Sequence, residues 1–155
     1  MLPEESWSPG FELSNCQINV ELDTEVLSLA IPRAFCEVSR SPSGSEPSLM
    51  ASLGHLEISI LDDAEIARIH DEQMGDPTAT DVITFQHGEL LISADTAQRE
   101  AMSRKWPVER ELLLYIVHGL LHLHGYDDLT PDLREAMHAQ QDAILDRLWP
   151  LKASD

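Results

Sequence analysis

Alternation of polar and apolar residues along the chain predicts a small β-sheet. Two segments alternate in this way, residues 16–22 (CQINVEL) and 55–61 (HLEISIL), as half-buried strands do. Two shorter apolar runs, DVITF at 81–85 and ELLIS at 89–93, are separated by only three residues. They are predicted to form neighbouring strands.

Apolar residues at helical spacing predict helices between and after these strands. The segment 24–39 has this spacing, although Pro32 favours a kink or an early break within it. Asp62 or Asp63 can cap a second helix, which ends before the turn GDPTAT. A polar helix is predicted at 93–105. A last helix, with Thr130 as its cap, is predicted at 131–148.

The most hydrophobic helix follows Pro107, which suits the first helical position. Its sequence, ELLLYIVHGLLHLHG at 111–125, is apolar nearly all round, which is typical of a helix buried within a domain. Gly125 is a natural C-terminal stop. The pattern therefore predicts an α+β fold, in which a small mixed sheet packs with helices around one buried central helix.

Length and composition favour a single domain over residues 1–155, since 43% of the residues are hydrophobic. Residues 1–15 are expected to be irregular, and they resemble neither a signal peptide nor a transit peptide. The Ser-, Pro- and Gly-rich segment 40–54 is expected to be a flexible loop. Cys16 and Cys36 are too few for a disulfide scaffold. With no bilayer-spanning segment, we expect a cytoplasmic protein that does not contact membranes.

The net charge of −18 repels polyanions at long range, so charge alone argues against nucleic acid as a partner. One stretch, residues 99–110, is locally basic, because it contains four basic and only two acidic residues. It reads equally well as an ordinary solvated face or as an RNA-contact patch. Its four basic residues are Arg99, Arg104, Lys105 and Arg110.

His118 and His122 are four residues apart on the buried helix, so both imidazoles lie on one face and can share a metal ion. Gly125 lets the chain turn, and Asp128 can then return as an oxygen ligand. Two histidines and one carboxylate, with a fourth position open, form a known catalytic zinc set. The open position would hold an activated water molecule.

The segment has two other interpretations. The histidines could be ordinary core residues, but two buried imidazoles without partners cost several kcal/mol, about as much as any polar group stranded in an apolar interior. His124 lies about 160° around the helix from His122 and is expected to face solvent or cap the helix end. A zinc protease is disfavoured, because Gly119 stands where such enzymes have their glutamate base.

The segment 118–128, HGLLHLHGYDD, resembles the YbeY family of bacterial endoribonucleases, whose signature reads H-G-x-L-H-L-x-G-Y-D-H. TDVITF at 80–85 is similar to the family's T-D-V-L-S-F strand, and GELLIS at 88–93 to its G-D-I-x-I-S strand. The resemblance implies a zincin-like fold and a zinc-dependent endoribonuclease specific for single-stranded RNA. It also implies a role in ribosomal RNA processing, notably at the 3′ end of small-subunit RNA, with the ribosome and assembly factors as partners.

Two positions depart from the family pattern. Asp128 stands where the family's third ligand is histidine, and we carry the metal role over to it. Met74 stands where many relatives have a phosphate-contacting arginine, and it is expected to fill a gap in the core. Asp127 is expected to form the turn or support the site. A second hypothesis is therefore a metal-binding ribosome-assembly factor with little catalysis.

Overall fold

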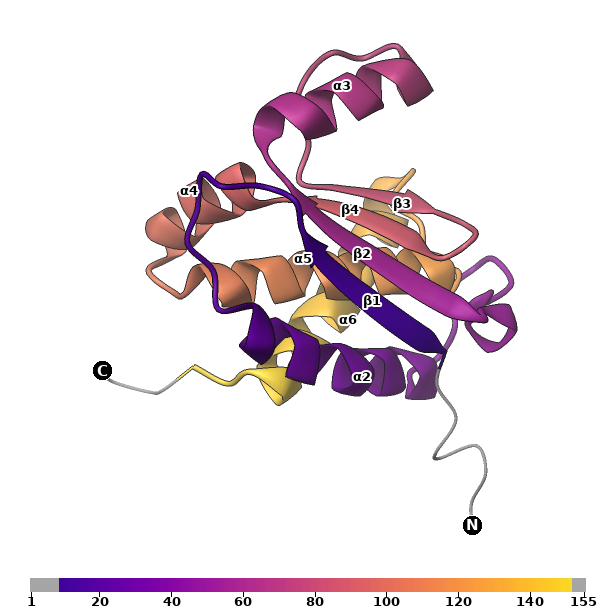
Figure 1. Cartoon of the computed structure of the whole chain (residues 1–155). Coiled ribbons are helices and arrows are strands. Elements are labelled where there is room, and N and C mark those ends of the chain that lie inside the picture. The colour runs from indigo at the N-terminus through magenta and orange to yellow at the C-terminus, as the bar shows by residue number, and fades with distance from the viewer. Residues whose placement is uncertain (1–8, 152–155) are drawn as a thin grey trace.

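The computed structural model describes residues 9–151 and has an α+β architecture (Figure 1). A four-stranded sheet has the order β1-β2-β4-β3. β1, β2 and β4 are parallel, and β3 is antiparallel to β4, so the sheet is mixed as predicted. The strands are β1 (Gly10–Asn15), β2 (His55–Leu61), β3 (Val82–Phe85) and β4 (Glu89–Ser93).

Four of the helices begin at a side-chain cap. The cap is Asp23, Asp62, Ser93 or Thr130, and its side-chain oxygen accepts a hydrogen bond from the backbone N–H three residues later. The predicted caps Asp62 and Thr130 are thereby confirmed. The α-helices are α2 (Thr24–Arg40), α3 (Asp63–Met74), α4 (Ala94–Arg104), α5 (Val108–Leu123) and α6 (Pro131–Leu148).

The first strand lies earlier in the chain than the sequence predicts. β1 covers residues 10–15 and pairs with β2 from Gly10 opposite His55 to Asn15 opposite Ile60. The predicted strand at 16–22 is wrong, and so is the irregular structure expected for residues 10–15. The apolar positions of 16–22 do not all face the core, since Ile18 is 97% exposed. Residues 1–8 lie outside the described residues.

The structure differs from the sequence prediction at two prolines. α2 continues through Pro32 to Arg40, so the predicted break does not occur. The helix is held by its buried face, which packs against α5 through Leu27, Ile31 and Phe35 among others. Pro107 precedes the first residue of α5 rather than occupying it.

α5 is the central helix of the fold, as predicted. It contacts α2, α4 and α6 as well as β3 and β4, and most of its residues are buried. The main core lies between α5, α2, α6 and one face of the sheet (Figure 1). A smaller cluster on the other face, formed by Leu61, Ile66, Ile83 and Leu91, packs α3 against the strands.

The segment between α2 and β2 contains only a short 3₁₀ helix, Met50–Ser52. Three backbone hydrogen bonds attach this segment to the end of α5: Gly44 N–H to the His124 oxygen (3.1 Å), Glu46 N–H to Gly125 (3.0 Å) and Leu49 N–H to Leu123 (2.8 Å). The flexibility expected for 40–54 stays a prediction. The contacts themselves brace the turn that follows α5.

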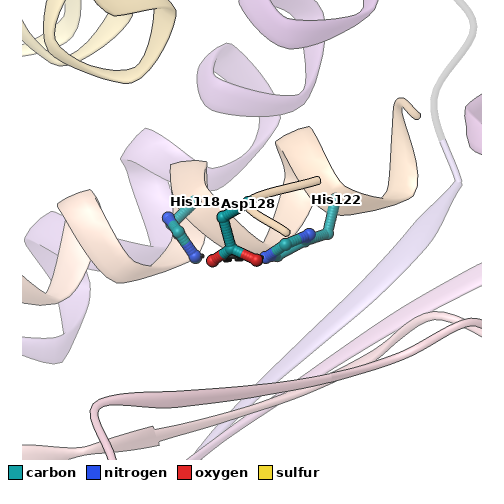
Figure 2. Close-up of side chains that lie close together, drawn as sticks. All are labelled: His118, His122 and Asp128. Carbon is teal, nitrogen blue, oxygen red and sulfur yellow. Dashed lines mark hydrogen bonds and ion pairs between the residues drawn. The ribbon is translucent and has the colours of Figure 1, made fainter. Parts of the chain in front are cut away.

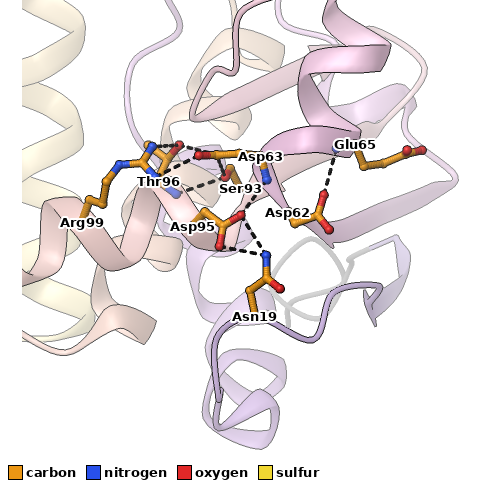
Figure 3. Close-up of polar contacts among 8 residues, drawn as sticks. All are labelled: Asn19, Asp62, Asp63, Glu65, Ser93, Asp95, Thr96 and Arg99. Atoms are coloured by element: carbon orange, nitrogen blue, oxygen red, sulfur yellow. Dashed lines mark hydrogen bonds and ion pairs between the residues drawn. The ribbon is translucent and has the colours of Figure 1, made fainter.

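A polar cluster ties the beginnings of α3 and α4 together (Figure 3). The Asp63 carboxylate accepts hydrogen bonds from the hydroxyls of Ser93 (2.6 Å) and Thr96 (2.9 Å) and pairs with Arg99 (2.9 Å). The Asp95 carboxylate accepts the backbone N–H of Asp63 at 2.8 Å. The cluster therefore fixes α4, which leads directly into α5. None of the helices in 9–151 has the length and apolar character needed to cross a membrane.

Candidate metal centre and adjoining cavities

α5 presents His118 and His122 one turn apart on the same face, as the sequence predicts (Figure 2). Their Nε2 atoms are 3.2 Å apart. Asp128 returns after the turn, with its Oδ2 4.0 Å from the Nε2 of His122. One donor atom from each of the three residues lies within 4.8 Å of the other two, so the structure brings together the complete predicted set.

The turn between α5 and α6 places Asp128. Gly125 has φ +98°, and a Cβ there would come within 2.1 Å of the Glu46 carbonyl oxygen, so this position requires glycine. The Asp127 carboxylate accepts the backbone N–H of Leu129 at 3.0 Å. Asp127 is thus a turn former, one of its two predicted roles, and it leaves its neighbour Asp128 to face the histidines.

The Nδ1 atoms of both histidines are engaged by acceptors. The Nδ1 of His118 lies 2.7 Å from the side-chain oxygen of Gln141, and the Nδ1 of His122 lies 3.1 Å from the Tyr126 carbonyl oxygen. Carbonyl oxygens only accept hydrogen bonds, so each Nδ1 carries the proton. In the neutral rings the two Nε2 lone pairs then face each other. Such a pair repels unless a cation lies between them.

The environment of His118 favours the neutral, ligand form of its imidazole. Burial lowers its pKa, and the nearby His122 lowers it further. The hydrogen bond to Gln141 and the carboxylates of Asp81 and Asp128 act in the opposite direction without reversing the shift. Because metal ions bind deprotonated imidazole, His118 is ready to act as a ligand near neutral pH.

The donor set fits a tetrahedral metal ion such as zinc. With ligand distances of about 2.0–2.1 Å, two tetrahedral ligands are about 3.3 Å apart. The two nitrogens already have this separation, and Asp128 reaches it with a small side-chain movement. Three protein ligands leave one coordination position open, as catalytic zinc sites do.

A second group of potential ligands lies on the sheet, away from α5. It consists of Glu12, His55 and Glu57, on β1 and β2. Glu12 and His55 are exposed, and the Nε2 of His55 lies 3.9 Å from the Glu12 carboxylate. Its ring nitrogens are not oriented by buried hydrogen bonds like those of His118, so the α5 set is the stronger metal candidate.

Gly119 lies where α5 is closest to the sheet. A Cβ at this position would be 2.7 Å from a methyl carbon of Leu90 and 3.2 Å from the hydroxyl of Thr84. A glutamate here would require the side chains of Leu90 and Thr84 to shift. The packing thus adds a physical reason to the sequence argument against a metalloprotease.

Two cavities meet at the three candidate ligands His118, His122 and Asp128, called the metal set from here on. The residues that line both cavities are Thr80, Asp81 and His118. The smaller cavity, of about 670 Å³, contains all three candidate ligands and is bordered by the end of α3 and the turn after α5. The larger, of about 900 Å³, extends between α4, the start of α5, and α6. The two cavities adjoin at these shared residues, and together they make up the groove beside the two histidines, with His118 bordering both cavities and His122 the smaller one.

Comparison with known proteins assigns the chain to a family. A sequence model described as "Endoribonuclease YbeY" matches residues 12–149. The chain belongs to the YbeY family. A relative named endoribonuclease YbeY from Chlamydia muridarum is 32% identical over 151 residues, which cover 89% of this chain and 87% of the relative.

A second YbeY relative agrees with this assignment, and one solved structure shares the fold. The YbeY protein of a Synechococcus strain is 33% identical over 130 residues, covering 72% of this chain and 73% of the relative. The solution structure of TM1509 from Thermotoga maritima has the same fold, with a TM-score of 0.60 and 20% identity. The matched region covers 90% of this chain and 89% of the TM1509 chain.

The predicted RNA-contact residues are less free than the sequence implies. Arg99 pairs with Asp63 at 2.9 Å, and Arg104 pairs with Glu100 at 3.6 Å and with Glu111 at 3.4 Å. Both arginines line the larger cavity. Lys105 is exposed at the end of α4 and lines neither of the two cavities. Contact of these residues with RNA stays a prediction.

The expectation that Arg110 lies on a solvated basic surface is wrong. Its side chain is 1% exposed and bonds to the Asp146 carboxylate and to the Trp149 carbonyl oxygen, both at 2.9 Å. Its guanidinium also stacks over the Trp106 ring at 4.2 Å. Arg110 is the first buried residue of α5. Its guanidinium bonds to Asp146 and Trp149 and so links α5 to the C-terminal end of α6.

The structure confirms one of the two roles expected of His124 and corrects the expectation for Met74. His124 caps the C-terminal end of α5 and does not face solvent: it is 6% exposed, and its ring nitrogens form hydrogen bonds with the Ser48 hydroxyl and the Ser41 carbonyl oxygen, both at 2.8 Å. Met74 is not a core residue, since it is 69% exposed and borders the smaller cavity. Arg68 pairs with glutamates on its own helix and lines neither of the two cavities.

Sequence reasoning missed two residues that shape the site. Gln141 supports His118 from the buried face of α6, and a glutamine within an otherwise apolar stripe (Met137, Ile144, Leu145) was the available signal. Glu111 is the second of these residues, and it lies in the first turn of α5. It is buried beside the larger cavity and accepts the indole N–H of Trp106 at 2.9 Å. Burial raises the pKa of its carboxyl, although the charge of Arg104 opposes this shift.

Proposed function

We propose that this protein is a metal-dependent endoribonuclease that cleaves single-stranded RNA, with His118, His122 and Asp128 holding a zinc ion. Family membership supports the class of reaction. One geometric observation carries the metal site: two half-buried imidazoles whose Nδ1 atoms are both hydrogen-bonded direct their Nε2 atoms at one point.

A bound metal ion supplies two effects here, a water molecule of lowered pKa and polarisation of the phosphoryl oxygen. The protein supplies orientation. Gln141 and the Tyr126 carbonyl hold the two rings, while the turn braced by residues 44–49 holds Asp128. The two adjoining cavities offer room for an RNA strand on either side of His118.

The proposed substrate is ribosomal RNA, and the proposed role is maturation of the 3′ end of small-subunit RNA during ribosome biogenesis. The ribosome, its assembly factors and a cytoplasmic location belong to the same proposal. Its support is the YbeY family assignment, since cleavage of RNA is what the family name describes.

A second candidate is a ribosome-assembly factor that binds the metal ion but cleaves RNA only slowly. Two observations favour it. Asp128 adds negative charge to the metal set, which makes bound water less acidic than a third imidazole would. In addition, none of the described residues that line the smaller cavity is arginine or lysine, so cationic stabilisation of phosphate there falls to the metal.

The deciding experiment incubates the purified protein with single-stranded RNA, with and without a chelator, and measures metal content in parallel. We expect chelation to abolish cleavage and added zinc to restore it. His122→Ala should lose both metal and cleavage, since it removes a central ligand. His87→Ala is the matched control, because His87 is exposed on the β3–β4 turn and lines neither of the two cavities.

Cleavage that persists in chelator would overturn the metal-dependent mechanism. Metal binding and ribosome association without cleavage would instead favour the assembly factor.

A further inference from the structure

The smaller cavity contains a third histidine with no role in the metal set. His70 lies in the C-terminal half of α3, is half-buried, and borders this cavity together with Met74. The other titratable groups lining it, apart from the candidate ligands, are the carboxylates Glu46, Asp81 and Asp127 and the phenol of Tyr126, whose hydroxyl donates to the Pro42 carbonyl oxygen. The cavity is therefore rich in hydrogen-bond acceptors, and His70 faces it from the side of α3.

The hydrogen bonding of His70 determines what its free nitrogen can do. Its Nδ1 lies 2.9 Å from the carbonyl oxygen of Thr78. Because that oxygen only accepts, Nδ1 carries the proton, and in the neutral ring Nε2 has a lone pair. No residue within the described chain forms a hydrogen bond with Nε2. His70 thus presents one unused acceptor beside the metal set.

The loop that orients His70 is itself held in place. The Asp76 carboxylate accepts hydrogen bonds from the hydroxyl of Thr78 at 2.7 Å and from its backbone N–H at 3.0 Å. The hydroxyl bond and the backbone bond from Thr78 lower the pKa of Asp76, so its carboxylate stays ionised near neutral pH. The Thr78 carbonyl, and with it the tautomer of His70, is therefore set before substrate binds.

An acceptor in this position matches one group of an RNA strand. Phosphate oxygens only accept hydrogen bonds, and base N–H groups differ from one nucleotide to the next. The ribose 2′-hydroxyl is a donor that every ribonucleotide has and every deoxyribonucleotide lacks. We propose that the Nε2 of His70 accepts a hydrogen bond from the 2′-hydroxyl of the nucleotide in the smaller cavity, and so selects ribose over deoxyribose. This inference rests on the proposed endoribonuclease function.

The test is a scan of one single-stranded RNA substrate in which each nucleotide in turn is replaced by its 2′-deoxy form. Cleavage efficiency, kcat/KM, is measured for the metal-loaded wild type and for His70→Ala, His70→Gln and His87→Ala. In the wild type we expect one position near the cleaved bond where the deoxy substitution lowers efficiency about 3- to 10-fold, the effect of one lost hydrogen bond.

For His70→Ala we expect a similar loss on all-RNA substrate and no further loss at that position. His70→Gln, whose side-chain oxygen can accept, should restore part of the discrimination, and His87→Ala should behave as wild type. If His70→Ala keeps every deoxy penalty of the wild type, His70 only supports the loop and the inference is wrong. An inactive metal-loaded wild type would instead overturn the proposed function itself.

Discussion

Gln141 shows how one side chain on a neighbouring helix orients a candidate metal ligand. Its side-chain oxygen accepts the Nδ1 proton of His118 at 2.7 Å, from a position that is 8% exposed. A ring that rotated freely would present either nitrogen to the cavity. The hydrogen bond removes that freedom and increases the basicity of Nε2, which strengthens binding to a metal ion.

Gln141→Leu should therefore weaken metal affinity about 10- to 100-fold while the protein stays folded, because leucine fills a similar volume among apolar neighbours. The measurement is competition for zinc against a chromophoric chelator, with thermal unfolding as the check on folding. Gln140→Leu, one position earlier on α6, is the matched control. Equal affinities for both variants would show that Gln141 does not orient the ligand.

Among the elements, α3 and α4 are linked by a charge that the fold keeps ionised (Figure 3). Burial raises the pKa of Asp63, but hydrogen bonds from Ser93 and Thr96 and the ion pair with Arg99 outweigh it, and the pKa is lowered. The ionised form of Asp63 is therefore favoured more in the folded state than in the unfolded state. Its stabilising effect is complete above the ordinary pKa of aspartate and disappears as the pH falls through the lowered value.

Asp63→Asn should reduce the free energy of unfolding by roughly 1–3 kcal/mol at neutral pH, the typical loss for hydrogen bonds to a charged group. The difference from wild type should begin to shrink below about pH 4, where the carboxylate of the unfolded wild type takes up a proton, and should disappear at the lower pH where the folded carboxylate is protonated as well. Urea unfolding at a series of pH values measures this. Asp71→Asn, on the exposed part of α3, serves as control. A difference that does not change with pH would contradict the role of the charge.

Periodicity predicted most elements but not the first strand, and the reason lies in pairing. β1 is an edge strand whose only neighbour is β2, and its Phe11 is 38% exposed, so its burial pattern is weak. The stronger alternation at 16–22 has no strand to pair with. Sheet order depends on contacts between distant segments, which a local pattern does not contain.

The candidate ligands were predictable because they lie within eleven residues and helical geometry fixes two of them. The surroundings were not. Arg110 belongs to a basic stretch, and only the packing of α5 against α6 shows that its charge is buried. His70 is separated from His118 by 48 positions, so its place in the same cavity follows from the sheet topology alone.

Across the whole molecule, the distribution of charge limits how RNA can bind. The net charge is −18, and the arginines of the groove lie in the larger cavity, where each is paired with a carboxylate. An arginine that is already paired with a carboxylate neutralises a phosphate only partly, so few of the counterions condensed on the RNA are released. Binding of a single strand weakens with salt by a logarithmic slope of about 0.7 for each phosphate neutralised.

Three paired arginines therefore limit the slope to about 2. We expect a labelled single-stranded RNA, titrated by fluorescence anisotropy in chelator to prevent cleavage, to show a slope no steeper than this. Arg99→Ala and Arg104→Ala should each reduce the slope by less than about 0.7, because each also frees a carboxylate partner. A slope of about 3 or more would mean that Lys105 and the arginines contact phosphates as free cations, as the basic stretch of the sequence first implied. The main attraction for RNA would then lie on the surface of α4 rather than in the groove beside His118.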